Sequence, residues 1–257
     1  MVEKRATCDT YVVSGIPGGF QQRVYADFSS ATSGGDVATL LSQYGLSISD
    51  YSINGSPVPH TFTPNNAALG AGTLNLKVSA YSGSGAVQSA EVVTDTTFKY
   101  ASVRTVMKSS TTPGIVEGNF FYLNDNQEID FEILTSTVSQ ASSCVPAGIW
   151  ATNQALTAGG ASTHQTIPFT FNPTQAFHEY RIDWSSSATT FYIDGQQKAK
   201  LTSNIPTAAG HWIWNVWSNG DLCWSNGPPT ANSITQIRSI DIYKGYTSTV
   251  SGNICNV

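Results

Sequence analysis

Charged side chains are scarce in this chain. Lys and Arg together number 12 and Asp and Glu 17 among 257 residues, which gives a formal net charge of -5. Such a balance argues against nucleic acid or an anionic membrane as a partner. No apolar run approaches the roughly 18 residues of a membrane-spanning helix. We therefore expect a monomer whose partner is a neutral polymer, with no nucleic acid and no membrane involved.

The motifs of several common chemistries are also missing. The sequence has no GxSxG turn, no Walker loop and no HExxH pair, and its four His residues are scattered. Hydrolysis by a serine of the GxSxG type, phosphoryl transfer and zinc hydrolysis therefore have no support. No cofactor is expected to be required.

Cysteine is rare but even in number. The four residues, Cys8, Cys144, Cys223 and Cys255, are widely spaced and form no CxxC pair. Two disulfides in a secreted, extracellular protein are the favoured interpretation, with three connectivities open. Our preferred pairing joins Cys8 with Cys255 and Cys144 with Cys223.

The first residues carry a possible processing signal. Lys4 and Arg5 stand directly before Ala6 and resemble a dibasic site cut by kexin-type proteases. Residues 1–5 would then be leftover pro-segment or expression residues, and 6–257 a single domain. An ordinary basic tail is an equally acceptable interpretation of two residues.

Short apolar runs separated by turn residues dominate the rest of the chain, which contains 22 Gly and 11 Pro. This pattern, with almost no long helical periodicity, predicts an all-β sandwich or jelly roll of two antiparallel sheets. One short helix is expected over 37–44, a loop over 54–66, and an Asp194-Gly195 hairpin of type I′. Strands are predicted at 73–78, 86–94, 100–108, 115–122, 127–134, 147–151, 166–171, 178–184, 189–193, 212–217 and 234–243.

Three acidic residues alternate with large apolar ones in the stretch Glu128-Ile129-Asp130-Phe131-Glu132. Period-two alternation places the acids on one face of a strand and the apolar residues in a core. Like charges on one face destabilise a sheet, so the row indicates function. The two Glu Cα atoms lie about 13 Å apart, at roughly 3.3 Å per residue. Inward-leaning carboxyls would approach the ~5–5.5 Å of a retaining glycosidase, and less tilt would give an inverting spacing. A solvated acidic face or a cation site is the alternative.

A second candidate stretch, 211–220, is rich in Trp. Alternation places His211, Asn215 and Trp217 on one face, and Trp212 and Trp214 on the other. The amide of Asn215 indicates that its face is the wet one. Sugar rings present C–H faces that pack on aromatic side chains, so Trp217 is a candidate sugar platform, although large aromatics are more often core residues.

The acidic motif and several other segments resemble a known family. The sequence Glu128-Ile129-Asp130-Phe131-Glu132 resembles the ExDxE signature of glycoside hydrolase family 16, the β-jelly-roll glucanases and transglycosylases. The segments 100–108, 113–122, 177–184 with 191–195, 212–220 and 237–243 are also similar to lichenases. The resemblance covers roughly residues 20 to 246. It implies a concanavalin A-like jelly roll with a concave substrate cleft.

The resemblance also implies roles for individual residues. Glu128 would be the nucleophile, Asp130 the auxiliary acid that orders it, and Glu132 the general acid/base. The substrate would lie against four further residues, namely Asn215, Trp217, Arg104 and Trp150.

The motif lacks the extra residue, and therefore the β-bulge, of typical laminarinases. The unbulged form is shared by lichenases, xyloglucan transglycosylases and fungal chitin-glucan crosslinking enzymes, which favours mixed-linkage β-1,3-1,4-glucan over β-1,3-glucan as the substrate. The expected protein is a fungal retaining endo-β-glucanase. A transglycosylase of the same fold and a lectin-like glucan-binding module are the alternatives. Some relatives bind a structural calcium through a residue like Asp241, but a polar strand residue is the preferred interpretation here.

Overall fold

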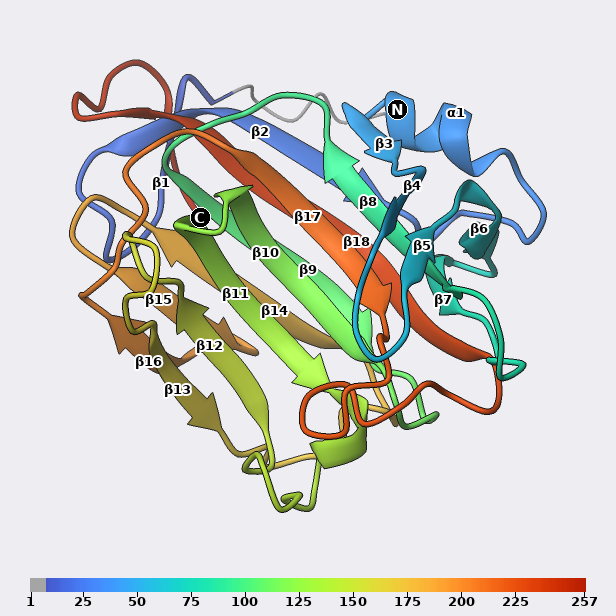
Figure 1. Cartoon of the computed structure of the whole chain (residues 1–257). Coiled ribbons are helices and arrows are strands. Elements are labelled where there is room, and N and C mark those ends of the chain that lie inside the picture. Colours follow the sequence, from blue (N-terminus) through green and yellow to red (C-terminus); the bar gives the residue numbers. More distant parts are fainter. Residues whose placement is uncertain (1–7) are drawn as a thin grey trace.

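Short alternating segments form almost all of the regular structure in residues 8–257, the part of the chain that the computed structural model describes. The predicted processing site at Lys4 and Arg5 lies outside these residues. Two large, mainly antiparallel sheets pack face to face, and the viewer of Figure 1 looks onto one of them, the front sheet, with the back sheet behind it. The predicted all-β jelly-roll sandwich is therefore confirmed.

The spatial order of the strands shows how distant segments meet. The back sheet contains β16 (Gln196–Leu201), β15 (Thr189–Ile193), β14 (His178–Trp184), β9 (Ala101–Lys108), β18 (Ser233–Thr247), β2 (Gly19–Asp27), β1 (Thr10–Val12) and β19 (Ile254–Asn256), with β7 (Thr73–Val78) beside β18 and β6 (Ala67–Gly70) beside β7. The front sheet contains β13 (Thr163–Ile167), β12 (Ile149–Asn153), β11 (Gln127–Leu134), β10 (Val116–Asn124), β17 (His211–Trp217), β8 (Val87–Thr94), β5 (His60–Phe62) and β4 (Tyr51–Ile53), with β3 (Leu46–Ile48) beside β8.

Helical structure is minor. The helix α1 (Val37–Ser42) begins after Asp36, whose carboxylate accepts a hydrogen bond from the Thr39 backbone N–H at 3.0 Å, a normal N-cap arrangement. Two single 3₁₀ turns, η1 (Pro64–Asn66) and η2 (Thr135–Thr137), lie in connections. The prediction of one short helix is confirmed.

The core between the two sheets is formed by the apolar side chains on the inward face of each central strand. Trp184, Trp212 and Trp214 are fully buried there, as alternation predicts. The indole N–H of each of these three residues finds an acceptor, which avoids the cost of an unpaired donor. The Trp212 Nε1–H donates to Asn119 Oδ1 at 2.7 Å, and the Trp214 Nε1–H to Thr105 Oγ1 at 2.8 Å.

Local sequence patterns predict the central strands better than the edges. The ranges 127–134, 178–184 and 189–193 match β11, β14 and β15 residue for residue. The prediction of a loop over 54–66 is partly wrong, because β5 and η1 lie within this range. The predicted strand at 166–171 is also displaced, since β13 ends at Ile167.

The turn and disulfide predictions hold. Asp194 and Gly195 have φ values of 49° and 73°, the positive pair that a type I′ hairpin requires. Cys8 is bonded to Cys255 and Cys144 to Cys223. The first bridge lies where β1 pairs in parallel with β19, so it ties the two ends of the described chain together. Within residues 8–257, no helix is long and apolar enough to cross a membrane.

Candidate active site

The three acids of β11 project from the exposed, concave face of the front sheet. Ile129 and Phe131 point the opposite way and are 0% and 2% exposed in the core, whereas Glu128, Asp130 and Glu132 line a cleft. Strand β11 lies between β10 and β12, so both of its edges are paired. The backbone that carries the acids is therefore held from both sides.

The pairing of β10 with β11 is regular through the motif. It runs without a shift from Val116 opposite Leu134 to Tyr122 opposite Glu128, and the irregularity comes only beyond Tyr122. No bulge interrupts the stretch Glu128 to Glu132. The unbulged form that the residue count predicts is confirmed.

The cleft has a volume of about 490 Å³ and crosses the front sheet from β4 to β11. This volume lies within the range of small-molecule binding sites. The residues that line it are Tyr51, Ile53, His60, Phe62, Glu91, Phe120, Tyr122, Glu128, Asp130, Glu132, Ile213, Asn215 and Trp217.

Burial is the main electrostatic influence on the three acids. It raises the pKa of Glu128, and repulsion by Asp130 and Glu132 raises it further. Burial likewise raises the pKa of Asp130, although the Gln154 side chain donates to it at 2.8 Å and opposes the shift. The pKa of Glu132 lies well above its ordinary value, again through burial first and repulsion by Asp130 second. The set therefore retains protons at a pH where free carboxyls would be ionised.

Asn215 is held beside the acids by a close packing arrangement. In the paired register, Gly118 lies between Glu132 on one side and Asn215 on the other. A Cβ at Gly118 would come within 2.6 Å of Asn215 Oδ1, so only glycine leaves room for this amide. The Asn215 Nδ2–H donates to Glu91 Oε2 at 3.2 Å. Its Oδ1 is buried and has no hydrogen-bond partner within residues 8–257, and is therefore an acceptor for a ligand hydroxyl.

Aromatic rings form the walls near the acids. Trp217 stacks on His60 with ring centroids 5.2 Å apart and an angle of 21° between the planes. Trp150 lies opposite Glu132 on the neighbouring strand, and packs edge-on against Trp224 at 5.1 Å. The structure thus brings Asn215 and Trp217 into the cleft with the acids, and Trp150 onto the adjoining part of the same sheet.

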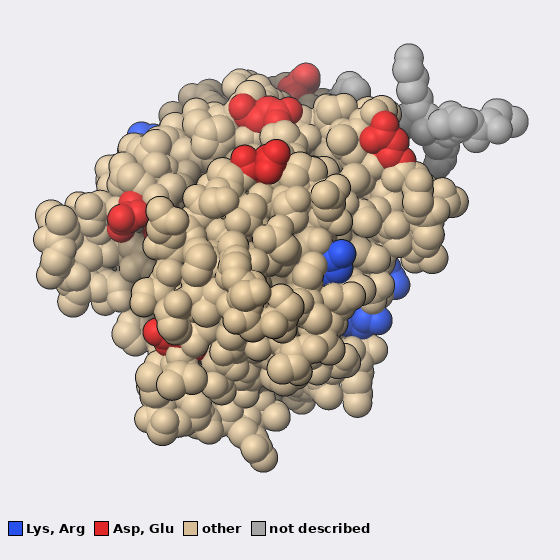
Figure 2. All heavy atoms as spheres, turned by 45° about the vertical axis from the view of Figure 1, so that its right-hand side comes forward, with Lys and Arg blue, Asp and Glu red and all other residues tan. Residues whose placement is uncertain are grey.

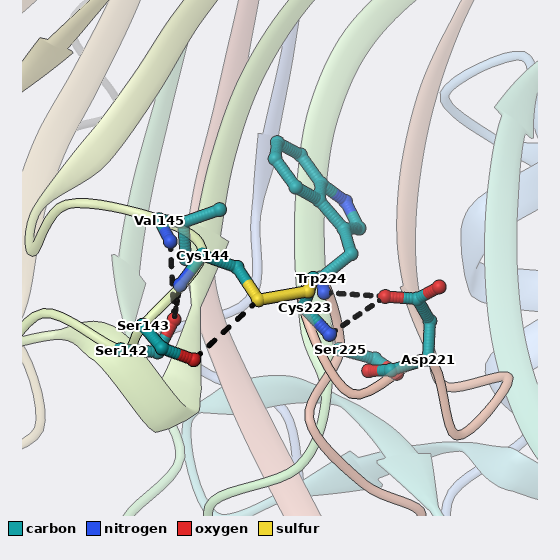
Figure 3. Close-up of a disulfide and its surroundings, with 8 residues drawn as sticks. All are labelled: Ser142, Ser143, Cys144, Val145, Asp221, Cys223, Trp224 and Ser225. Carbon is teal, nitrogen blue, oxygen red and sulfur yellow. Dashed lines mark hydrogen bonds between the residues drawn. A yellow bond between two sulfur atoms is a disulfide. The ribbon is translucent and has the colours of Figure 1, made fainter.

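A disulfide fixes the loops beside Trp150 and Trp224. Cys144 precedes β12, Cys223 follows β17, and their bond joins the two connections (Figure 3). The backbone N–H groups of Cys223 and Trp224 both donate to Asp221 Oδ1, at 2.8 and 2.7 Å. The Trp224 indole is therefore positioned by a turn that is itself covalently tied.

Sequence reasoning missed eight of the residues that line the cleft, among them Glu91, Tyr51 and His60. Glu91 is 3% exposed and accepts hydrogen bonds from the Ser49 hydroxyl at 2.7 Å and the Tyr51 hydroxyl at 3.0 Å. Burial raises the pKa of Glu91 and, at His60, lowers the pKa of the imidazole. An acid within the apolar run 90–93 was a usable signal for Glu91, whereas nothing local pointed to Tyr51 or His60.

The expectation that Arg104 lines the cleft is wrong. Arg104 belongs to β9, which pairs with β14 and β18 in the back sheet, and it faces a separate hollow on the outer side of that sheet. The sandwich core separates it from the acids. Arg104 alternates with the buried Val103 and Thr105 and points away from the core, but this alternation does not indicate which sheet the strand joins.

Asp241, the residue considered as a calcium ligand, forms an ion pair with Arg23. The Arg23 guanidinium binds its carboxylate at two points, with Nε to Oδ1 at 2.8 Å and Nη2 to Oδ2 at 2.9 Å. The Tyr243 hydroxyl donates to Oδ2 at 3.0 Å. Because a side-chain cation already occupies both oxygens, this site does not fit a calcium ligand and fits an ion-paired strand residue.

Comparison with known proteins agrees with the fold and the motif. The chain matches the profile of Glycosyl hydrolases family 16 over residues 54–232. A β-glucanase of Bacillus subtilis (strain 168) is 27% identical over 127 residues, a match that spans 48% of each chain and thus about half of the relative's length.

Two solved structures show the same architecture. A β-1,3-1,4-glucanase (lichenase) derived from a mouse hindgut metagenome superposes with a TM-score of 0.69 and 21% identity, covering 87% of this chain and 99% of the other. The Crh5 transglycosylase in complex with NAG superposes with a TM-score of 0.61 and 20% identity, covering 89% and 86%. At these identities the likeness supports the fold alone.

Proposed function

Because the family profile covers well over half of its length, the protein belongs to glycosyl hydrolases family 16, and we propose that it is a retaining endo-β-glucanase. The proposed substrate is mixed-linkage β-1,3-1,4-glucan, with β-1,3-glucan as the second choice. Glu128 acts as the nucleophile and Glu132 as the general acid/base. Asp130 is the auxiliary acid that orders Glu128 and accepts its proton.

The chemistry proceeds in two displacements. Glu128 attacks the anomeric carbon while Glu132 gives its proton to the leaving glycosidic oxygen, so a glycosyl–Glu128 ester forms and the aglycone departs. Glu132, now a carboxylate, then takes a proton from a water molecule whose oxygen attacks the same carbon and releases Glu128. Before the first step Glu128 must be ionised, and Asp130 accepts the proton that it gives up.

One observation carries this proposal: three carboxyls with raised pKa values, that of Asp130 buried and those of Glu128 and Glu132 half-buried, project from consecutive outward positions of one regular strand into a cleft. A raised pKa supplies the protonated acid that the first displacement needs near neutral pH. None of the lining residues in the described part of the chain is Lys or Arg. A binding module would gain little from such mutually repelling acids.

The surface supports a neutral polymer as the substrate. Figure 2 shows a face on which uncharged residues predominate, with only a few acidic and basic groups. The similarity to the β-glucanase of Bacillus subtilis (strain 168) favours a β-glucan, and the unbulged strand favours the mixed-linkage type. We further propose that the protein is secreted, which the two disulfides support. Its fungal origin stays a prediction.

A transglycosylase is the second candidate. The aromatic pair Trp150 and Trp224 at one end of the acid row favours it. Such a pair would hold a sugar acceptor that competes with water for the glycosyl–Glu128 ester. Hydrolase and transglycosylase share every group of the first displacement, so only the products distinguish them.

The test is incubation with lichenan, laminarin and xyloglucan, with and without a labelled acceptor oligosaccharide. We expect new reducing ends from lichenan, and a Glu128→Gln rate lower by about 10³-fold or more, as for groups acting on the reacting atoms. The exposed Asp95→Asn serves as a carboxyl-to-amide control and should leave the rate unchanged. Full activity of Glu128→Gln would refute the assigned nucleophile. If the wild type forms neither reducing ends nor labelled transfer product, the enzyme proposal fails and a lectin-like module remains.

A further inference from the structure

A second hollow lies on the outer face of the back sheet, across the sandwich from the acids. Its volume is about 560 Å³, which is within the range of small-ligand sites. Its lining residues are Arg23, Tyr25, Asp27, Arg104, Val106, Glu179, Ser239 and Asp241. None of them lines the cleft of the front sheet.

The floor of this hollow is built by strand register. Of its lining residues, Arg104, Asp241 and Tyr25 lie directly opposite one another across β9, β18 and β2. Each strand in this row is paired on both edges. The side chains therefore project from a rigid surface rather than from loops, which favours a preformed site.

Arg104 differs from the neighbouring guanidinium groups. Arg23 is paired with Asp241, and Arg181 with Asp183. The Arg104 guanidinium lies 5.1 Å from the centroid of the Tyr243 ring, but its buried Nε–H and Nη2–H groups have no hydrogen-bond partner among the described residues. Buried charged donors without acceptors are costly, so these groups are suited to oxygen atoms of a ligand.

The charges of the lining select the class of ligand. Two guanidinium groups stand against the three carboxylates of Asp27, Glu179 and Asp241, and one guanidinium is already neutralised by Asp241. A small anion would meet the two remaining carboxylates, and a cation would meet Arg104. A neutral polyhydroxylated ligand satisfies both, because its hydroxyls donate to carboxylates and accept from guanidinium N–H groups.

Tyr25 adds a flat surface at the same place. Its side chain is 44% exposed, although large apolar groups on this sheet are mostly covered. The Arg23 guanidinium lies 5.0 Å from the ring centroid and holds the ring in place. An exposed, immobilised ring next to hydrogen-bonding groups is the combination that packs against the C–H face of a sugar.

We propose that this hollow is a second saccharide-binding site, which takes a neutral β-linked glucan chain. The choice of glucan rests on the proposed function, whereas the class of ligand rests on the hollow itself. Because the hollow and the cleft lie on opposite sheets, one protein molecule can bind glucan at both. Simultaneous engagement of a polymer raises its effective concentration at the cleft without any new catalytic contact.

The experiment separates the two sites in a Glu128→Gln background, which prevents turnover. Binding of a mixed-linkage gluco-oligosaccharide is measured by calorimetry, and retardation on native gels containing lichenan is measured in parallel. We expect two sites in the parent. Tyr25→Ala and Arg104→Met should each weaken the outer site by about tenfold, as truncation of an anchoring side chain does. Tyr25→Phe, which keeps the ring, should bind as the parent does.

Control variants make each failure recognisable. Ile234→Ala removes an equally exposed side chain of the same sheet outside the hollow and should change nothing. Trp217→Ala should remove the cleft site and leave the outer one. If Tyr25→Ala and Arg104→Met both bind two oligosaccharides like the parent, the second site is refuted. If Trp217→Ala has no effect and the wild type shows no activity, the proposed function fails, while a loss with Tyr25→Ala would still establish the outer site.

Discussion

Gly118 provides the sharpest test of how the cleft is built. A Cβ at this position would lie 2.6 Å from Asn215 Oδ1 and 3.2 Å from Cδ1 of Phe120. Ordinary van der Waals contact begins at 3.4 Å. In Gly118→Ala the Asn215 amide must therefore move by about 0.8 Å, the difference between the first and the last of these distances.

That displacement breaks a hydrogen bond that is already long. Asn215 Nδ2 lies 3.2 Å from Glu91 Oε2, and a further shift of this size places it beyond hydrogen-bonding distance. A buried acceptor that loses its donor costs about 1–3 kcal/mol. We expect the free energy of unfolding to fall by about this amount, which lowers the melting temperature by about 2–4 °C per kcal/mol. If the same loss reaches the transition state, kcat/KM falls by about 5- to 150-fold.

A double-mutant cycle is the assay. The value of kcat/KM on lichenan and the melting temperature are measured for Gly118→Ala, Asn215→Ala and the double variant. If the clash with the amide is the whole effect, Gly118→Ala changes neither quantity once Asn215 is Ala. An equal loss in both backgrounds would show that Gly118 acts through something other than Asn215 and would refute the reasoning.

Three further predictions concern titrating and stacking groups. The raised pKa of Glu132 keeps this general acid protonated, so activity should be lost as pH rises. Asp130→Asn removes the repelling charge, so the alkaline limb of its residual kcat/KM profile should move to lower pH. An unmoved limb would contradict this coupling between Asp130 and Glu132. Burial raises the pKa of Glu117, which accepts from Ser and Thr hydroxyls in the core, so its contribution to stability is full at acid pH and is lost as pH rises through the raised value. The melting temperature of Glu117→Gln should therefore fall less than that of the parent as the pH is raised. His60→Ala should raise KM several-fold because it releases the Trp217 ring that stacks on His60. His60→Phe keeps an aromatic ring against Trp217 and should leave KM unchanged. Equal KM values for the two variants would show that His60 does not position Trp217.

The strand that carries the acids could be predicted because one of its faces belongs to a dense core. Alternation assigns Ile129 and Phe131 to that core without ambiguity, and the acids follow onto the other face. The same reasoning places Asn215 and Trp217 correctly on β17. Wherever a strand has one apolar and one polar face, the sequence contains the orientation of every side chain.

The remaining site residues depend on how strands combine. Arg104 points away from the core, but its strand β9 pairs with β14 and β18 in the back sheet. No local sequence pattern indicates that pairing. Tyr51 and His60 lie on three-residue strands in a stretch rich in turn residues, and β5 reaches the cleft only by pairing in parallel with β8. Partners that are distant in sequence decide such positions.

The separation of charge between the two sheets explains why the misplacement of Arg104 matters for the chemistry. The cleft contains Glu91, Glu128, Asp130 and Glu132, and no Lys or Arg among the lining residues of the described chain. A guanidinium at this place would lower the pKa values of the acids and remove the proton that the leaving oxygen needs. It would also oppose the positive charge that develops on the sugar in an oxocarbenium-like transition state. A cleft lined by acids alone retains protons in the resting state and stabilises that charge once Glu128 ionises. The placement of Arg104 on the outer sheet is therefore what the proposed reaction requires.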